Sequence, residues 1–343
     1  MTDTAAPPTL DDVARLARVS TATVSRCINS PDRVAASTRA RVETAIKTLG
    51  YTPNFAARFM AAKRTFTIGA IIPTMENAIF ARGLQAFQEE LHQRGYTLLV
   101  SSSAYKAEAE EEQIRTLVAR GADGLLLIGH DRDPQIYDYL AQQHVPVLVA
   151  WSYSETARVP SIGFDNRAAM RSLAERMIAL GHKRIAMISG ISEQNDRARL
   201  RIEGVKDAMA AHGLDPERLA PVELPYDVHS GAAAFVDLMS HSPRPSLVLC
   251  GNDVLAVGAL RGAHQLGLKV PEDVSITGFD DIELAQVVTP ELTTVHVPHR
   301  EMGRKAAQEL VGMVEEKRQG VSEKLETTIM ERSSVSILRD QSE

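Results

Sequence analysis

The sequence has little of what marks secreted, membrane-spanning or disulfide-stabilised proteins. Only two of its 343 residues are cysteines. Cys27 lies in a helix-like apolar pattern and Cys250 ends an apolar run, so we expect both as buried small hydrophobes in a reducing compartment. The opening MTDTAAPP has no apolar stretch of signal-peptide length, and no apolar run approaches a membrane span. These absences predict a cytoplasmic protein without a membrane partner.

Signatures of enzymes and of metal sites are also missing. The chain contains no Gly-rich loop of the P-loop form, no G-x-S-x-G elbow and no Cys/His cluster with metal-ligand spacing. The nearest histidine pair, His296 and His299, has no further suitably spaced ligand, so we expect it on the surface. The sequence therefore predicts no catalytic residue, no metal and no cofactor.

Aromatic residues are scarce at 5%, whereas 44% of the chain is hydrophobic. This composition is typical of an α/β protein packed with Ala, Leu and Val, and the length allows two or three domains. The charge is uneven, because residues 1–64 carry a net +5 and the remainder carries -11. A basic head on an acidic body fits a local site for a polyanion, although ordinary scatter of surface charge gives the same numbers.

The stretch DDVARLARVSTATVSRCIN predicts two short helices with a break between them. Apolar residues from Leu10 to Ala17 recur at helical spacing, and Ser20 is suited to N-cap the second helix. The outer side of that second helix carries small or hydrogen-bonding residues and Arg26, whose guanidinium can bind a phosphate or a guanine edge. This pattern is typical of a helix-turn-helix, and the alternative is a small helical bundle with a solvated polar face.

A third helix is predicted before residue 50, where Val42, Ala45, Ile46 and Leu49 follow helical spacing and Gly50 ends the pattern. Three short helices complete a small domain. Beyond it, NFAARFMAA predicts a further short helix that needs a partner surface for stability.

From Thr67 onward the pattern changes to strands alternating with helices. Such alternation indicates βαβ units and parallel sheets. Two runs of it are separated near residues 160–166, and a helix is expected from Pro298 to about Lys317. The core is therefore expected to have two α/β lobes with a ligand cleft between them.

Polar and aromatic residues follow several of the predicted strands, at the edge where open parallel sheets bind ligands. They are His130, Asp131, Trp151, Phe164, Asp165, Asn252, Asp253, Asp280 and Asp281. Each of them has an alternative role as a cap of the following helix, most clearly Asn252 and Asp253.

Several motifs in order along the chain resemble the lactose-repressor and purine-repressor family of bacterial transcription regulators. They are LDDVARLARVSTATVSRCIN, LGYTPNFAARFM, ALGHKRIAMISG, RLRIEGV, NDVLAVGAL, SITGFDD and PELTTV. The resemblance implies a small all-α helix-turn-helix head plus an α/β periplasmic-binding-protein-like core of two parallel-sheet lobes. The implied boundaries are 1–52 for the head, 53–65 for a hinge helix and linker, and 66–343 for the core. Lobe 1 would be about 66–163 and 296–325, and lobe 2 about 164–295 and 326–340.

The resemblance also implies that a homodimer binds a palindromic operator in double-stranded DNA. The residues it assigns to DNA contact are Thr21, Ala22, Thr23, Ser25, Arg26, Asn29, Asn54, Arg58 and Met60. Thr21 and Ala22 would read bases, and the hinge would enter the minor groove. Met60 stands where the family usually inserts a leucine between base pairs, and a flexible apolar side chain still suits that wedge. No heptad pattern follows the last strand-like run, which favours a dimer over a tetramer.

For a small-molecule effector, the resemblance points to the cleft. The expected effector-binding residues are His130, Trp151, Phe164, Asp165, Arg197, Arg201, Tyr226, Asn252, Asp253 and Asp280. Arginine with paired Asp and Asn side chains suits vicinal hydroxyls, and aromatic faces stack on sugar rings. Arg197 and Arg201 together favour a sugar acid, whereas an Arg197 that points to solvent would leave a plain sugar.

The function expected is a ligand-responsive repressor that a sugar or sugar acid releases from DNA. A regulator that needs a corepressor is one alternative. Less expected are a cytoplasmic sugar-binding protein without a DNA role, and an enzyme that uses Asp253, Asp280 and His130 as acid-base groups.

Overall fold

The computed structural model describes residues 7–29, 31–52, 64–76 and 78–338. The chain forms two compact units, Met1–Thr65 and Phe66–Glu343, which are treated separately below. No helix in the described ranges is both long and apolar enough to cross a membrane.

The N-terminal unit is a cluster of short helices around a small core. It contains α1 (Leu10–Ala17), α2 (Thr21–Asn29), a 3-10 turn (Pro31–Arg33) and α3 (Ala36–Leu49). Ser20 Oγ accepts from the backbone N–H of Thr23 at 3.2 Å, which confirms the predicted cap of α2. Gly50, with φ +62°, ends α3 as expected. Val13, Val24 and Val42 are fully buried between the helices, and Cys27 is buried beside them.

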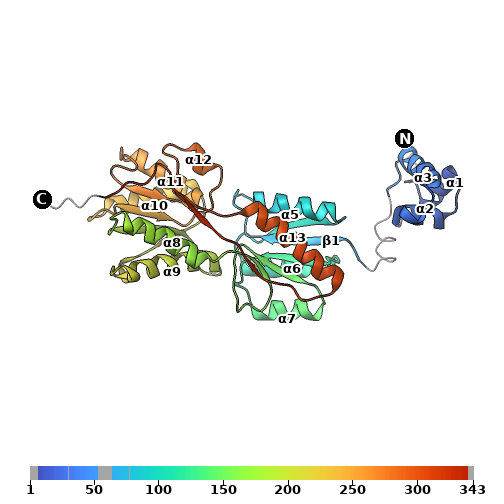
Figure 1. Cartoon of the computed structure of the whole chain (residues 1–343), viewed down its shortest axis with the longest axis horizontal. Helices are drawn as coiled ribbons and strands as arrows, with labels where there is room; N and C mark the ends of the chain where they lie inside the picture. Colours follow the sequence, from blue (N-terminus) through green and yellow to red (C-terminus); the bar gives the residue numbers. More distant parts are fainter. Residues whose placement is uncertain (1–6, 30, 53–63, 77, 339–343) are drawn as a thin grey trace, which may run out of the picture. The chain divides into compact units, whose positions relative to one another are not determined.

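The first lobe of the core is built on a parallel sheet. In the described residues its strand order is β11-β5-β4-β3-β1-β2. The strands are β1 (Thr67–Ile72), β2 (Thr97–Ser102), β3 (Gly124–Ile128), β4 (Val147–Ala150), β5 (Ser161–Gly163) and β11 (Glu323–Lys324). Helices α5 (Ala81–Gln93) and α13 (His299–Glu316) pack on one face. Helices α6 (Ala107–Ala119) and α7 (Pro134–Gln142) pack on the other, as Figure 1 shows.

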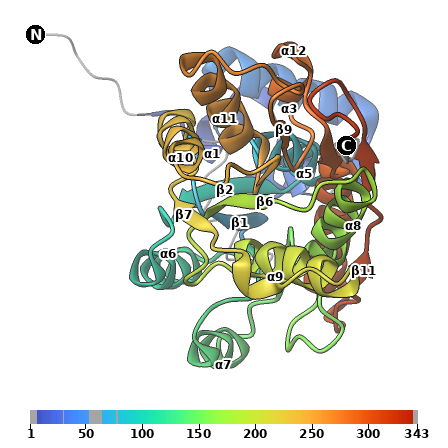
Figure 2. The same cartoon turned by 90° about the vertical axis from the view of Figure 1, so that its left-hand side faces the viewer.

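The second lobe repeats this arrangement on a sheet of order β7-β6-β8-β9. Its strands are β6 (Ile185–Gly190), β7 (Val222–Leu224), β8 (Leu247–Cys250) and β9 (Ser275–Thr277). Its helices are α8 (Asn166–Ala179), α9 (Asp196–Ala211), α10 (Val228–Ser240), α11 (Asp253–Gln265) and the short α12 (Leu284–Val287). Figure 2 shows α10 and α11 on one side of β6 and α8 and α9 on the other. Cys250 is fully buried, as predicted.

The chain passes between the lobes at the β5–α8 connection, between β10 (Thr294–His296) and α13, and between β11 and β12 (Thr328–Met330). β10 and β12 pair with each other as an antiparallel ribbon. The carboxyl ends of the strands of both sheets face the region between the lobes, so polar residues after each strand come together there. The helix expected from Pro298 is α13, and its start brings His299 to this junction.

Candidate functional site

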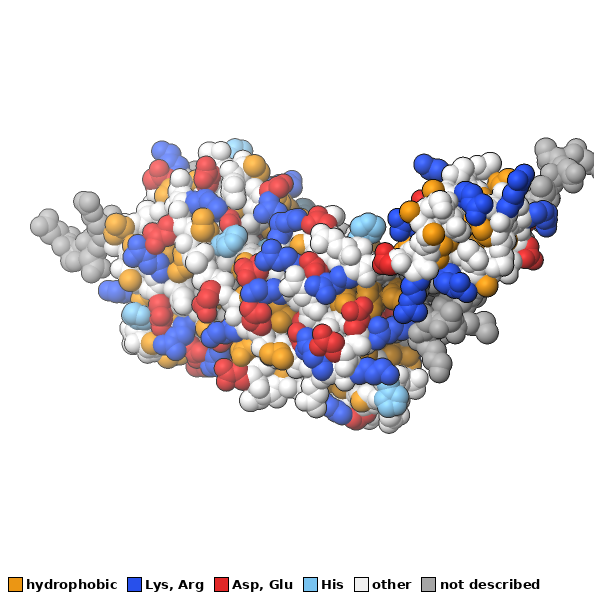
Figure 3. Space-filling model, turned by 45° about the vertical axis from the view of Figure 1, so that its right-hand side comes forward, with side chains coloured by type: hydrophobic (Ala, Val, Ile, Leu, Met, Phe, Trp, Pro, Cys, Tyr) orange, Lys and Arg blue, Asp and Glu red, His pale blue; other side chains and the backbone are white. Residues whose placement is uncertain are grey.

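The outer face of α2 is the candidate DNA-reading surface. Ala22 and Arg26 are exposed one helical turn apart, while Val24 is fully buried on the opposite side. Thr21, Thr23 and Ser25 are partly exposed, and the hydroxyl groups of Thr23 and Ser20 lie 2.9 Å apart. Arg26 forms no ion pair with any residue that the structure describes, which leaves its guanidinium available to a phosphate. Blue side chains gather over the visible face of this unit, with few red ones among them (Figure 3).

The side chains of the remaining predicted DNA contacts lie outside the part of the chain that the structure describes. Asn29 lies in α2, and its side chain is outside the description. Asn54, Arg58 and Met60, and with them the expected hinge helix, lie outside the described residues. Their roles stay predictions.

The floor of the cleft in lobe 2 is organised around Arg201 of α9. Its Nε donates to Asn166 Oδ1 at 2.9 Å, and its Nη1 donates to the carbonyl of Gly251 at 2.6 Å. Its Nη2 lies 3.4 Å from Asp280 Oδ1, and its guanidinium stacks 3.7 Å above the ring of Phe279. These bonds occupy the guanidinium and fix the position of the Asp280 carboxyl group.

Three polar atoms of the predicted set are buried without a partner in the described residues: Asp280 Oδ2 and Asn252 Nδ2 at this floor, and His130 Nε2 in lobe 1. Leaving such atoms unpaired costs free energy, so they mark a place where a ligand can supply the missing bonds. Together a carboxylate oxygen, an amide N–H₂ and an imidazole nitrogen match the donors and acceptors of neighbouring hydroxyl groups. Asn252 Oδ1 also accepts from the N–H of Leu255, so Asn252 caps α11 and still leaves its amide nitrogen for a ligand.

Asp280 has an unusual backbone conformation and a raised pKa at this floor. Its φ of +103° is in the left-handed region, which non-glycine residues rarely adopt and which often marks functional positions. Burial raises the pKa of its carboxyl group to about 6, and the nearby Arg201 acts in the opposite direction. A ligand hydroxyl that donates to Oδ2 would stabilise the charged form.

The outer part of the cleft is a chamber of about 550 Å³ between the two lobes. Tyr105 of lobe 1 and Tyr226 of lobe 2 meet there, with ring centroids 5.8 Å apart. Tyr105 is 39% exposed, yet burial raises the pKa of its hydroxyl group, so the hydroxyl end points inward. Its place directly after β2 follows the same strand-end rule as the predicted residues, and our sequence reasoning missed it.

The chamber is acidic. Among its lining residues, Glu76, Glu108, Glu193 and Asp227 oppose the single lysine, Lys106. Such a lining disfavours the approach of an anionic ligand.

Asp196 and Arg197 connect the two lobes directly. Asp196 Oδ2 accepts from the backbone N–H of His130 at 2.9 Å and from Ser152 Oγ at 2.8 Å. Arg197 Nη1 donates to Ile128 O at 3.1 Å and to Asp196 Oδ1 at 3.0 Å. Burial opposes ionisation of Asp196, but Arg197 and these donors outweigh it and lower its pKa. We call Asp196 and Arg197 the interlobe latch. The strand-end pattern did not reveal Asp196, because it is the first residue of α9 and does not directly follow a strand.

The latch also settles where Arg197 points. The side chain is buried and bound to lobe 1, so the solvent alternative is wrong. Arg201 donates from all three of its guanidinium nitrogens, whereas Arg197 donates only from Nη1 to residues that the structure describes.

Other predicted effector residues lie behind the floor or serve local structure. Asp253 accepts from the N–H of Ile282 at 2.8 Å and from Thr294 Oγ1 at 2.6 Å, which uses both of its oxygens. Asp165 caps α8 by accepting from the N–H of Ala168. Phe164 is buried and stacks on Phe279 at 6.0 Å, beneath Arg201.

Trp151 and His299 are buried, whereas His296 is half-exposed, as expected of a surface residue. Trp151 is 2% exposed, and its Nε1 donates to His299 Nδ1 at 3.2 Å, so its indole N–H is already paired. The expected surface position of His299 is wrong, because it is 4% exposed. His296 is half-exposed and bonds to Asp281 through Nδ1.

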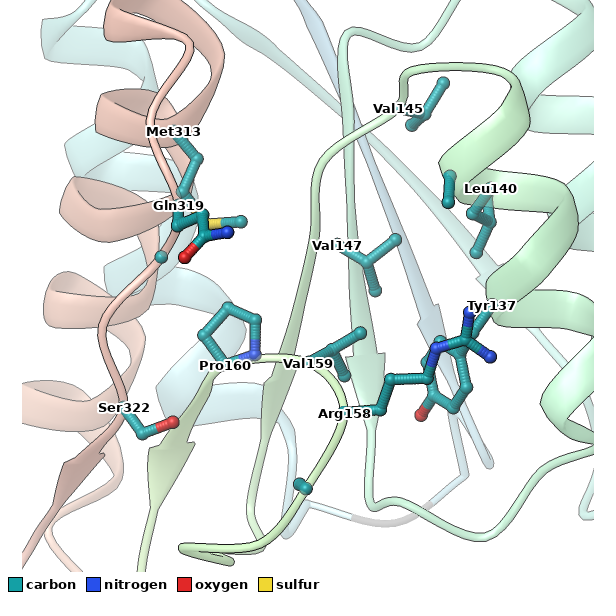
Figure 4. Close-up of a pocket in the computed structure, with 13 residues that line it drawn as sticks. Tyr137, Leu140, Val145, Val147, Arg158, Val159, Pro160, Met313, Gln319 and Ser322 are labelled. Carbon is teal, nitrogen blue, oxygen red and sulfur yellow. The ribbon is translucent and has the colours of Figure 1, made fainter.

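A second pocket of about 420 Å³ lies away from these residues, on lobe 1. Figure 4 shows Met313 and Gln319 on one side of it, Leu140 on the other, and Val147 and Val159 between them. Its arginine, Arg158, is already bound to Asp138 and to the carbonyl of Pro134. The one charged side chain among the lining residues is therefore already paired.

Comparisons with known proteins agree with both units. The model of "Bacterial regulatory proteins, lacI family" matches residues 9–54, and that of the "Periplasmic binding protein-like domain" matches residues 174–335. The HTH-type transcriptional repressor CytR of Escherichia coli (strain K12) is 35% identical over 301 residues, which cover 87% of each chain.

Solved structures extend the match to nearly the whole chain. The Lac repressor dimer bound to operator and the anti-inducer ONPF has a TM-score of 0.85 at 28% identity, covering 96% of this chain and 100% of that one. The CelR–cellobiose complex has a TM-score of 0.71 at 30% identity, covering 95% and 99%. The chain therefore belongs to the lacI family of bacterial regulatory proteins and is a ligand-responsive, DNA-binding transcriptional regulator.

Proposed function

We propose that the protein is a homodimeric repressor that binds a palindromic operator and is released by a neutral sugar. The observation that carries the effector assignment is the set of buried polar atoms without a partner in the described residues, Asp280 Oδ2 and Asn252 Nδ2 at the floor and His130 Nε2 in lobe 1. Their geometry suits hydroxyl groups, and the acidic chamber outside them favours an uncharged ligand. The solved CelR–cellobiose complex, which has this fold, supports a sugar as the ligand.

A neutral sugar is preferred over a sugar acid because Arg201 is already bound at the floor and Arg197 is directed toward lobe 1. Arg197 is part of the interlobe latch, and Arg201 is bound to Asn166, Gly251 and Asp280. A carboxylate placed at the floor would meet the buried Asp280 carboxyl group, whose partner guanidinium, that of Arg201, already makes three bonds.

Dimerisation through lobe 1 is supported by its edge strand. β2 ends the sheet, and Leu99 and Val100 on it are 39% and 38% exposed. An exposed apolar edge strand invites pairing with another chain. The Lac repressor structure of the same fold is described as a dimer on operator.

The test begins with selection of bound sequences from a random duplex library, using the full-length protein at near-physiological salt. Binding to the recovered operator is then measured by fluorescence anisotropy with D-glucose, D-galactose, D-ribose and cellobiose, and with D-glucuronate and D-galacturonate. We expect a palindrome, and release by at least one neutral sugar but by neither acid. Tightening by a sugar would instead identify a corepressor, and equal affinity with and without every compound would refute the proposed effector.

The cleft assignment is checked with Asn252→Ala, which removes the unpartnered amide nitrogen. The matched control is Asn195→Ala, because Asn195 also caps a helix, α9, but lies at the outer chamber. We expect the first variant to lose the response to the sugar by at least about tenfold in concentration, and the second to retain most of it.

A further inference from the structure

A buried histidine, His299, lies between the floor of the cleft and lobe 1. His299, at the start of α13, uses both ring nitrogens: Nε2 lies 3.2 Å from the backbone oxygen of Asp280, and Nδ1 lies 3.2 Å from Nε1 of Trp151. A carbonyl oxygen only accepts and an indole N–H only donates, so these partners require the neutral tautomer with its proton on Nε2. Burial favours this state by lowering the pKa of His299 to about 4. His299 thus joins the backbone of Asp280 in lobe 2 to a side chain of lobe 1.

A second path, made of two hydrogen bonds through Asn166, connects Arg201 to Trp151. Asn166 Oδ1 accepts from Arg201 Nε at 2.9 Å, and Asn166 Nδ2 donates to the backbone oxygen of Trp151 at 3.0 Å. Asn166 is 1% exposed, so these bonds are shielded from water. The two floor residues that carry opposite charge, Arg201 and Asp280, are therefore each one side chain away from Trp151.

Backbone strain lies at both ends of the His299 path. Trp151 has φ +60° and Asp280 has φ +103°, both in the left-handed region. Such conformations persist only where the surroundings hold them in place. On the lobe 1 side, the ring of Phe80 meets Trp151 edge-on at 5.3 Å, and Gly83 of α5 packs so closely that a Cβ would overlap the indole. A shift of Trp151 would therefore displace α5.

We propose that His299 and Asn166 are positioning residues of the effector site, which hold Asp280 and Arg201 from behind and connect both to Trp151 in lobe 1. This inference rests on the proposed function, because it gives the sugar site its route to the rest of the core. It assigns Trp151 a role without ligand contact, as the residue on which the two paths converge.

The chain provides its own probe, since Trp151 is its only tryptophan. Two substitutions separate the bonds of His299. His299→Asn keeps an acceptor near the position of Nδ1 and loses the donor to Asp280; His299→Gln keeps a donor near the position of Nε2 and loses the acceptor for Trp151. Emission of the ligand-free full-length protein and its affinity for the most effective neutral sugar of the panel above are measured for each.

We expect His299→Gln to shift the emission of Trp151 and to weaken sugar binding less than His299→Asn does. We expect His299→Asn to keep emission close to the wild type but to weaken sugar binding by about tenfold or more. A merely structural role for His299 would not separate the two readouts in this way.

His182 offers the matched control, because it is fully buried and also binds a side chain and a carbonyl, Ser246 Oγ and Ser336 O, both at 3.1 Å. His182→Asn and His182→Gln are expected to change neither the emission nor the affinity beyond their effect on folding. Equal loss of affinity in the variants of both histidines would overturn the proposal, and so would unchanged emission in His299→Gln.

Failure of the proposed function gives a different result. The wild-type protein would then respond to no sugar of the panel, whereas the emission of ligand-free His299→Gln would still report whether His299 holds Trp151. An unshifted emission there overturns the link on its own.

Discussion

Replacing Asp280 by asparagine is expected to stabilise the core above pH 6 and to remove the response to sugar. Burial raises the pKa of this carboxyl group from 3.8 to about 6, so the folded protein holds its proton where the unfolded chain has lost it. A folded-state pKa raised in this way means that stability is fully present below about pH 4 and declines as pH rises through about 6. The shift of about two pKa units corresponds to about 3 kcal/mol at pH 8.

Asparagine keeps the shape of the side chain and tolerates the left-handed backbone of position 280 better than most residues. Asp280→Asn should therefore gain about 1–3 kcal/mol in free energy of unfolding at pH 8, and close to nothing at pH 4. The same variant should lose the response to sugar, because an asparagine amide has one acceptor oxygen where the carboxylate of Asp280 has two. Such a gain in stability at the expense of function is common for binding sites.

The assay is urea unfolding followed by circular dichroism at a series of pH values between about 4 and 8. Asp281→Asn is the matched control on the neighbouring residue. Burial works against ionisation of Asp281, but hydrogen bonds from Arg332 and His296 outweigh it and lower its pKa, so this carboxylate stabilises at high pH and its replacement should destabilise there. A loss of stability in Asp280→Asn that is the same at every pH would refute the reasoning.

Further predictions concern the DNA surface, the interlobe latch and the chamber. Arg26→Ala should weaken operator binding by about tenfold and reduce the slope of log affinity against log salt by about one, whereas Arg15→Ala on α1 should change both less; an unchanged slope would exclude a phosphate contact. Gly129→Ala should lower the thermal midpoint more than Gly267→Ala, because both have positive φ but only a Cβ at residue 129 overlaps Asp196 and Arg197; equal effects would argue against the latch. Tyr105→Ala should speed both association and release of the sugar in stopped-flow experiments, and unchanged rates would exclude a gate at the tyrosine pair.

The helix-turn-helix and the order of strands and helices in the core followed from the sequence because both depend on local patterns. Apolar spacing, the cap at Ser20 and the stop at Gly50 act within a few residues of each other. The strand-end rule likewise found Asn252 and Asp280, because the edge of a parallel sheet is itself a regular feature.

The same rule could not decide which strand-end residues face a ligand. Asp253 follows β8 just as Asn252 does, yet its oxygens are taken by Ile282 and Thr294, which arrive from other parts of the chain. No sequence pattern near Asp253 indicates those partners.

By itself, the sequence indicated the class of the protein through its resemblance to a known family. It determined the order of elements and the sheet edge at which polar residues gather, since these depend on spacing along the chain. Only the tertiary structure decided that Arg197 is bound to lobe 1, that His299 is buried and that the indole N–H of Trp151 is paired with it. The physical reason is that burial and hydrogen-bond partners are set by residues far away in sequence, which meet only when the two lobes fold against each other.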